Sequence, residues 1–276
     1  MLRTVGSKNM LNAEVKNVQI SVVCPTYNSE TYIARTMSSL VLQEEPPDEI
    51  IFCDDGSTDN TVVALEKWKQ KFLDQGVDIV IKTIAHQGPG VARNRGLELA
   101  RHVWVAFLDS DDAWDVAKLR RVRSEIVKNN DINFVLHWEE KRQVNGHKIT
   151  LRHGQKYRPG VAISRLLYKN NIFSTSAVVC RKEVLESVGG FDPTLPNAQD
   201  YDLWLRASDL IKLIVIPEVL GFCFEEVSSI TSRPYWQRYR SRIRVAWRHR
   251  RKGTVFDWLI KLGKITFSRQ WLAVLR

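Results

Sequence analysis

The feature that most constrains the fold is a repeated alternation in the first 112 residues. Short β-rich apolar runs at 19–24, 49–53, 77–84 and 103–108 are separated by segments whose apolar residues recur at helical spacing. Strands joined by helices in this way form a parallel sheet with helices packed on its faces. The sequence therefore predicts an α/β fold that opens with a βαβαβαβ unit.

Polar clusters stand where three of these runs stop. They are Pro25–Asn28, Asp54–Asp59 and Asp109–Asp112. In an open α/β sheet, ligands bind just outside the carboxyl ends of the strands. One such loop could be explained by turn chemistry alone. Three of them at one edge of a sheet favour a ligand site.

The most acidic cluster places three carboxylates, Asp109, Asp111 and Asp112, within four residues. Such a cluster repels itself and gains nothing from facing a core, so it needs a cation, a ligand or bulk water. A hard divalent ion prefers oxygen ligands and often joins one or two carboxylates to a substrate diphosphate. The alternative is an acidic turn in which Asp112 or Asp115 caps the next helix.

The second half is less regular. We expect strands at 132–138, 148–152, 176–180, 213–216 and 219–224, and helices at 160–168 and from 199 onward. In the first half, Ser29 is the expected N-cap of the first helix. Trp138 and Trp204 are the best candidates among the second-half aromatics for stacking on a sugar, although a core position is the general expectation for these aromatics.

Compartment and membrane topology follow from composition. Each of the four cysteines lies in an apolar run without metal-ligand spacing, which indicates buried, reduced thiols. Residues 1–17 look like a loose leader without the apolar core of a secretory signal, and no window is apolar enough to span a membrane. We expect a cytoplasmic protein.

Six motifs occur in an order and spacing that resemble those of the family 2 glycosyltransferases. The resemblance covers roughly residues 18–225. Its landmarks are Val22–Asn28, Asp54–Asp59, Gly90–Gly96, Asp109–Asp112, Gly189–Asp192 and Gln199–Arg206. It implies an α/β fold of the GT-A type, a Rossmann-like mixed sheet flanked by helices. Residues 18–232 would form the catalytic domain, with a nucleotide-binding half at 18–112 and an acceptor half at 113–232.

The resemblance also implies roles for individual residues. The nucleotide sugar would contact Pro25, Tyr27, Asp55, Arg93, Asp109, Ser110 and Asp111. Tyr27 would lie flat on the nucleotide base, and Asp55 would accept the imide hydrogen of that base, which favours a UDP-sugar. Asp109 and Asp111, with Asp112 beside them, would hold Mg²⁺ or Mn²⁺ on the diphosphate. Arg93 would add a positive charge near the donor; its alternative is a helix-surface arginine. His86, near the donor loops, is expected to be an ordinary polar residue or to touch phosphate.

Asp200 matches the catalytic base of the family. Inversion is a single displacement, so a carboxylate must take the proton of the acceptor hydroxyl on the face opposite the diphosphate. Two alternatives remain: Asp200 caps the helix that follows, or the neighbouring Asp202 is the base. Many relatives have Glu before this aspartate, whereas this chain has Gln199.

The net charge of +10 is concentrated at one end. Residues 233–276 carry 13 basic side chains against one acid, Asp257, a net +12 that leaves −2 for the rest. Trp236, Tyr239, Ile243 and Trp247 recur at helical spacing among arginines, and 255–275 is richer in apolar residues. Such basic amphipathic helices are typical of an interfacial membrane anchor. They can also pack back on the catalytic domain, and membrane binding and packing are compatible with each other.

The leading hypothesis is thus an inverting, metal-dependent glycosyltransferase on the inner face of the cell membrane. Its acceptor would be a lipid-linked glycan, a lipopolysaccharide or another cell-surface polysaccharide precursor. Transfer to a polyprenyl phosphate is the nearby alternative. Nucleic-acid binding through the basic tail is less favoured, because the basicity is confined to one amphipathic segment and the acidic loops repel phosphate. The retained Asp109, Asp111 and Asp200 argue against a catalytically dead glycan-binding relative.

Overall fold

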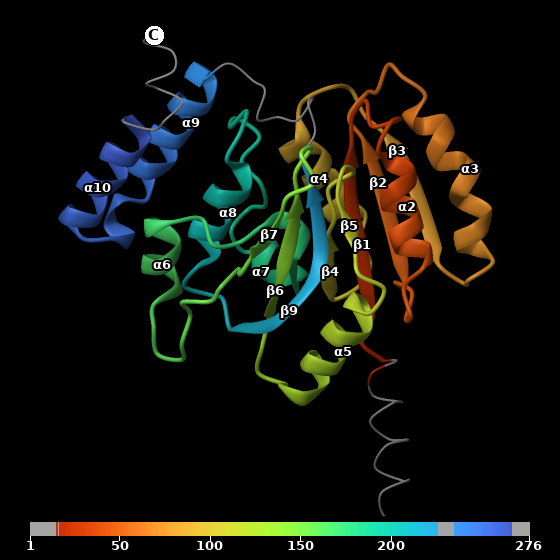
Figure 1. Cartoon of the computed structure of the whole chain (residues 1–276), viewed down its shortest axis with the longest axis horizontal. Coiled ribbons are helices and arrows are strands. Elements are labelled where there is room, and N and C mark those ends of the chain that lie inside the picture. Colours follow the sequence, from red (N-terminus) through yellow and green to blue (C-terminus); the bar gives the residue numbers. More distant parts are fainter. Residues whose placement is uncertain (1–14, 16, 226–234, 267–276) are drawn as a thin grey trace, which may run out of the picture.

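The computed structural model describes residue 15, residues 17–225 and residues 235–266, with the side chains of 235–238 excepted. Most of the expected leader therefore lies outside the described residues. The molecule is built on one mixed sheet with helices on both faces, and a helical pair at one end (Figure 1). The predicted α/β class is confirmed.

The first half forms the parallel part of the sheet, in the order β3-β2-β1-β4. Its strands are β1 (Ile20–Thr26), β2 (Glu49–Asp54), β3 (Asp78–Thr83) and β4 (Trp104–Phe107). The connecting helices are α2 (Ile33–Val41), α3 (Thr61–Leu73) and α4 (Pro89–Leu99). Strands β1, β2 and β4 are buried along their whole length, which explains why they read as continuous apolar runs.

The second half extends this sheet beyond β4 in the order β8-β6-β9-β5, with β7 beside β6. Its strands are β5 (Ala113–Trp114), β6 (Phe134–Arg142), β7 (Lys148–Leu151), β8 (Val178–Arg181) and β9 (Leu213–Phe224). Its helices are α5 (Lys118–Lys128), α6 (Ile163–Lys169), the 3₁₀ turn η1 (Thr175–Ala177), α7 (Lys182–Glu186) and α8 (Gln199–Ala207).

Two local expectations are wrong. The strands predicted at 213–216 and 219–224 are one strand, because its pairing with β6 skips two residues: His137 pairs with Ile216 and Trp138 with Val219. This bulge accommodates Pro217, which has no N–H to give to a ladder. The first helix begins later than expected, with Tyr32 as its N-cap; the carbonyl of Ser29 accepts the N–H groups of Tyr32 and Ile33 instead.

The cap expected for the helix after Trp114 is also corrected. Ala117 is the N-cap of α5, and its N–H donates to the Asp115 carboxylate over 3.0 Å, so Asp115 supports the turn from two positions before the N-cap. Asp112 does not cap this helix, because its carboxylate turns inward and accepts the Ser176 hydroxyl at 2.6 Å.

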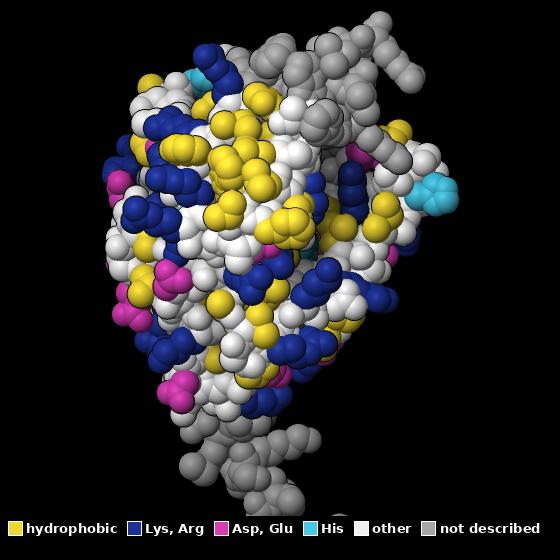
Figure 2. Space-filling view, turned by 90° about the vertical axis from the view of Figure 1, so that its left-hand side faces the viewer, with side chains coloured by type: hydrophobic (Ala, Val, Ile, Leu, Met, Phe, Trp, Pro, Cys, Tyr) yellow, Lys and Arg dark blue, Asp and Glu magenta, His cyan; other side chains and the backbone are white. Residues whose placement is uncertain are grey.

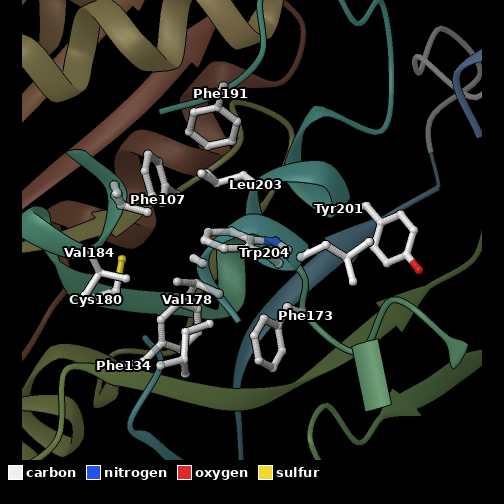
Figure 3. Close-up of a cluster of buried hydrophobic side chains, with 14 of the residues drawn as sticks. Phe107, Phe134, Phe173, Val178, Cys180, Val184, Phe191, Tyr201, Leu203 and Trp204 are labelled. Atoms are coloured by element: carbon white, nitrogen blue, oxygen red, sulfur yellow. The ribbon is translucent and has the colours of Figure 1, made fainter. Parts of the chain in front are cut away.

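Trp204 lies at the centre of the larger core cluster and has no exposed surface. The rings of Phe107, Phe134, Phe173 and Phe191 surround it with centroids 5.5 to 6.5 Å away (Figure 3). Removing such a side chain costs about 3–5 kcal/mol. The alternative role of Trp204 as a sugar platform is therefore wrong. It fixes α8 against the sheet instead.

The extension consists of α9 (Tyr235–Arg248), the short η3 (Arg250–Lys252) and α10 (Val255–Thr266). Figure 1 shows this pair beside α6 and α8. Val245 is fully buried in the larger core cluster, and the Tyr168 hydroxyl donates to the Ala246 carbonyl at 3.1 Å. The extension thus packs on the rest of the fold, as one of the two alternatives predicts.

The face of α9 that packs differs from the predicted stripe. Its buried positions include Ser241 and Val245, and His249, directly after the helix, is buried as well, whereas Trp247 is 57% exposed. His249 and Arg248 contact the carboxylate of Asp202 in α8. Among the described residues, no helix is long and apolar enough to cross a membrane.

Candidate functional site

The loops that follow β1 and β2 are tied to each other at the edge of the sheet. The Asp54 carboxylate accepts the Thr26 hydroxyl at 3.0 Å and the Ser57 N–H at 2.9 Å. Asn28, held at a positive φ of 47°, accepts the Thr58 N–H at 2.8 Å. These bonds give Asp54 a structural role and leave the neighbouring Tyr27 ring 45% exposed at the surface of the site.

Asp55 holds the loop that leads into α4. Its carboxylate is 2% exposed and accepts the N–H groups of Gln87 and Gly88, both at 2.8 Å. The His86 ring lies with Nδ1 2.9 Å from the same carboxylate and stacks on Tyr27 with centroids 4.2 Å apart. In this structure, the imidazole of His86 therefore occupies the position predicted for the base of the nucleotide. Pro25 is buried within β1.

The acidic loop is positioned by the hydroxyl of Ser176, which comes from η1. This oxygen accepts the Asp109 N–H at 3.1 Å and donates to the Asp112 carboxylate at 2.6 Å. Ser110 is held from the other side, where its hydroxyl lies 2.8 Å from that of Ser29. Asp109 and Asp111 remain partly exposed, whereas Asp112 is buried.

A buried lysine, Lys118, holds the backbone of Ser176 in place. The Lys118 ammonium has no exposed surface, donates to the Ser176 carbonyl at 2.8 Å and lies 3.4 Å from the centroid of the Trp114 ring. Burial lowers the pKa of Lys118, against the raising effect of Glu139 and Asp112. Sequence reasoning missed both Ser176 and Lys118, because a serine before a strand and a lysine in an amphipathic helix carry no distinguishing signal.

Arg93 connects the two halves of the site. Its guanidinium is buried and lies 2.5 Å from the Asp109 carboxylate. Burial lowers the pKa of Arg93, but the charges of Asp109, Asp200 and Asp111 outweigh it and raise the pKa. One cation thus interacts with the acidic loop and with the proposed base. The alternative of a surface arginine is wrong.

Asp200 is the second residue of α8, whose N-cap is Ala198, so the capping alternative does not account for its carboxylate. The side chain is partly exposed and accepts the Asn171 amide at 3.2 Å. Burial, with a contribution from Asp109, raises the pKa of Asp200 against the effects of the Tyr201 N–H and Arg93. A carboxyl group with a raised pKa is a stronger base than an ordinary aspartate once it is ionised.

Asp202, the competing candidate, has no exposed surface. Its carboxylate accepts Arg206 at 2.8 Å, Arg248 at 2.8 Å and His249 at 2.9 Å. With both oxygens occupied inside the protein, Asp202 fastens α9 to α8 and is not placed to receive a proton from a substrate.

A divalent metal fits part of the acidic loop. Among the described residues, no group of three or more His, Cys, Asp or Glu side chains is arranged to hold a metal ion. Mg²⁺ is usually bound by one or two carboxylates together with substrate phosphates, which the partly exposed Asp109 and Asp111 can provide. Asp112 does not fit, because its carboxylate is buried on Ser176.

Comparison with known proteins adds an independent line of evidence. The model of the family described as glycosyl transferase family 2 matches residues 21–189. An uncharacterised glycosyltransferase of Nostoc sp. is 33% identical over 184 residues, which cover 64% of this chain and 55% of that protein. The UDP-Glc:alpha-D-GlcNAc-diphosphoundecaprenol beta-1,3-glucosyltransferase of Escherichia coli is 30% identical over 188 residues, covering 67% of this chain and 68% of the relative.

Solved structures show the same fold. Residues 1–349 of S. aureus TarS in complex with UDP-GlcNAc superpose with a TM-score of 0.73 at 22% identity, over 94% of this chain and 76% of that one. A mannosyltransferase of Pyrobaculum calidifontis in complex with GDP-Man and Mn²⁺ gives 0.63 at 21% identity, over 92% and 71%. The chain spans 55% and 61% of the two uncharacterised curated relatives, from Nostoc sp. and Haemophilus influenzae.

Proposed function

The chain belongs to glycosyl transferase family 2, and from that premise we propose that it is an inverting enzyme that moves a sugar from a UDP-sugar to an acceptor hydroxyl. The observation that carries this proposal is the placement of Arg93, which is paired with Asp109 and interacts electrostatically with Asp111 and Asp200. The acidic loop expected to hold the donor and the expected base therefore share one site. We keep residues 18–232 as the catalytic unit and 233–276 as its extension.

The donor side rests on Tyr27, Asp55 and the acidic loop. Tyr27 offers an exposed ring for the base, and the Asp55 carboxylate retains the capacity for one further hydrogen bond once His86 moves away. The complex of TarS with UDP-GlcNAc supports a uridine nucleotide as the donor. Mg²⁺ or Mn²⁺ on Asp109 and Asp111 would neutralise the charge that develops on the departing diphosphate.

The acceptor side rests on Asp200. Its carboxylate takes the proton of the acceptor hydroxyl as that oxygen attacks the anomeric carbon, and the C–O bond to the diphosphate breaks on the opposite face. General-base assistance of this kind contributes about 10²–10⁴-fold. Arg93 remains paired with Asp109, so the site keeps a positive charge next to the departing group.

We further propose a lipid-linked glycan or another cell-surface polysaccharide precursor as the acceptor. The Escherichia coli relative, by its name, acts on a diphosphoundecaprenol-linked sugar, and other relatives include an amylovoran biosynthesis glycosyltransferase of Erwinia amylovora. Transfer to a polyprenyl phosphate stays as the alternative. There the acceptor oxygen is already ionised and needs less help from Asp200.

Contact with an anionic membrane through the extension is part of the same proposal. Val255, Phe256, Leu259 and Ile260 of α10 are 42 to 76% exposed. Figure 2 shows hydrophobic side chains gathered on this side of the molecule among many basic ones. An apolar face bordered by arginine and lysine is what an interfacial helix presents to anionic lipid. We prefer membrane contact to nucleic-acid binding, because an exposed apolar face makes no favourable contact with a phosphate backbone.

A product assay tests the proposed function. The full chain is incubated with a UDP-sugar, Mn²⁺ and either a prenyl-diphosphate-linked sugar or a prenyl phosphate, and the products are identified by mass spectrometry. A glycosidic product on the first acceptor supports the proposal. A sugar phosphate ester formed only on the second acceptor would establish the alternative.

A further inference from the structure

A cavity of about 340 Å³ lies between the loop that precedes α8 and the helix α9. It is lined by Leu195 and Pro196 from the loop and by Arg240, Ser241 and Arg244 from the helix. None of these residues takes part in the proposed transfer step. The cavity therefore requires its own explanation.

Among the described residues, no carboxylate compensates the positive charge at this cavity. Arg240 and Arg244 are exposed and stand one helical turn apart, and the structure gives neither an ion pair with a carboxylate among the described residues. Arg248, one turn further along α9, is by contrast paired with Asp192 and Asp202. Two guanidinium groups at a cavity without a carboxylate partner favour an anionic ligand.

A second, independent observation comes from Asn197, which follows Pro196. Asn197 is 8% exposed, and its side-chain nitrogen has no hydrogen-bond partner in the described part of the chain. A buried amide without a partner costs about 1–3 kcal/mol. Asn197 does not itself line the cavity, but it directly follows Pro196, which does, so the cavity borders a segment with an unsatisfied amide.

The cavity and the proposed base share one segment of chain. The Gln199 amide donates to the Leu195 carbonyl at 2.8 Å, which folds the loop against the start of α8. Ala198, at a positive φ of 60°, turns the chain from the cavity into the helix that carries Asp200. A group bound in the cavity is thereby held next to the loop that places the base.

We propose that this cavity binds the phosphate or diphosphate group of the acceptor and so positions its reacting hydroxyl for Asp200. The inference rests on the proposed transferase function and deepens it by assigning the acceptor a phosphate subsite. Planar guanidinium groups bind phosphate oxygens in pairs, and Leu195 and Pro196 offer apolar surface to the group that carries the phosphate. The donor diphosphate has a different predicted place, on the acidic loop with Arg93.

Calorimetric titration of the full chain with citronellyl diphosphate, in the presence of saturating UDP, tests this inference. Arg240→Gln and Arg244→Gln each remove one charge-assisted bond, so each should weaken binding of the prenyl diphosphate about tenfold. Arg242→Gln is the matched control, since it makes the same charge change on the exposed part of the same helix, away from the cavity. The control should stay within about twofold of the parent.

UDP affinity measured on the same proteins separates the two proposals. Unchanged UDP affinity with the predicted losses supports the phosphate subsite. Equal losses in all three variants would overturn it, because the effect would then be general electrostatics. Losses seen only with phosphatidylglycerol vesicles, and not with citronellyl diphosphate, would also overturn it and identify lipid headgroups as the ligand. A parent protein that binds the prenyl diphosphate but no UDP would contradict the proposed function and leave the subsite standing.

Discussion

The substitution Asp202→Asn tests whether the extension is fastened to α8 by one buried carboxylate. Asp202 is fully buried and accepts hydrogen bonds from Arg206 within α8 and from Arg248 and His249 of the extension. Asparagine has the same shape but no charge, and one of its two terminal groups is a donor. The variant therefore keeps the packing and loses the charge-assisted bonds.

The size of the effect follows from the pKa of Asp202. Burial raises this pKa, but the bonds from His249 and Arg206 outweigh burial and lower it from 3.8 to about 2. Such a shift corresponds to about 2–3 kcal/mol of folding free energy. Because the folded pKa is the lower one, this contribution is complete at neutral pH. It falls as the pH drops below about 4.5 and is roughly half gone at pH 3.

The assay is urea unfolding of the parent and Asp202→Asn at several pH values from 7 to 3. The difference between the two proteins cancels the titration of all other carboxylates. It should be at least about 2 kcal/mol at pH 7, since breaking a buried ion pair from one side is costly, and it should shrink by more than about 1 kcal/mol at pH 3.

Asp200→Asn should have the opposite effects: stability is kept and activity is lost. Since burial raises the pKa of Asp200, the fold disfavours its charged form, and asparagine should leave stability unchanged or higher. The same variant should lose kcat by about 10²-fold or more while UDP-sugar binding persists, because only proton transfer is removed. In the parent, kcat should fall with decreasing pH through a pKa above that of an ordinary aspartate. Equal stability of the parent and Asp202→Asn at every pH would refute the fastening role. A large loss of kcat in Asp202→Asn, with little loss in Asp200→Asn, would make Asp202 the catalytic base instead.

Three further predictions test other parts of the site. Asp111→Ala should weaken Mn²⁺-dependent UDP binding about 100-fold, measured by calorimetry, and leave the metal-free affinity unchanged; equal metal dependence in the variant would remove Asp111 from the proposed site. His86→Ala should bind UMP about 3- to 10-fold more tightly, because the stacked imidazole no longer has to be displaced from Tyr27; weaker binding would make His86 a wall of the base site. Phe256→Glu combined with Leu259→Glu should abolish sedimentation with anionic vesicles, whereas Leu42→Glu, at a 63% exposed position on another part of the surface, should not; equal binding of all three proteins would refute the membrane face.

The parallel half of the fold was predictable because its local signals agree with one another. Strands buried on both faces must be apolar throughout, so β1, β2 and β4 stand out from the helices between them. Pro89 at the start of α4 is a helix-initiating signal that needs no tertiary context. Here periodicity and helix-start chemistry were sufficient.

The second half was less predictable because tertiary contacts decide its elements. Pro217 predicts a strand boundary, but a bulge against β6 absorbs it and β9 continues. In α9, apolar spacing pointed to a stripe containing Trp247. The buried side chains instead include Ser241 and, directly after the helix, His249, which has an ion-pair partner in Asp202. A rule that counts only apolar residues cannot find a polar side chain buried by a distant partner.

The same limit applies to the site. Motif spacing was enough to nominate Asp109, Asp111 and Asp200, which the structure describes as partly exposed. It was not enough to separate Asp112 from its neighbours, because the hydroxyl of Ser176 that draws Asp112 inward lies 64 residues away in sequence. The orientation of a carboxylate depends on such contacts, and they leave no mark in the local sequence.

The central claim is that this chain transfers sugar from a UDP-sugar at the site joined by Arg93. Its most direct test is a panel of nucleotide sugars incubated with the purified full chain in Mn²⁺, with release of the nucleoside diphosphate as the readout. We predict release from at least one UDP-sugar, abolished by EDTA and reduced about 10²-fold or more in Asp200→Asn. Release that persists in excess EDTA, or the absence of binding and turnover of every nucleotide sugar by a folded protein, would contradict the account.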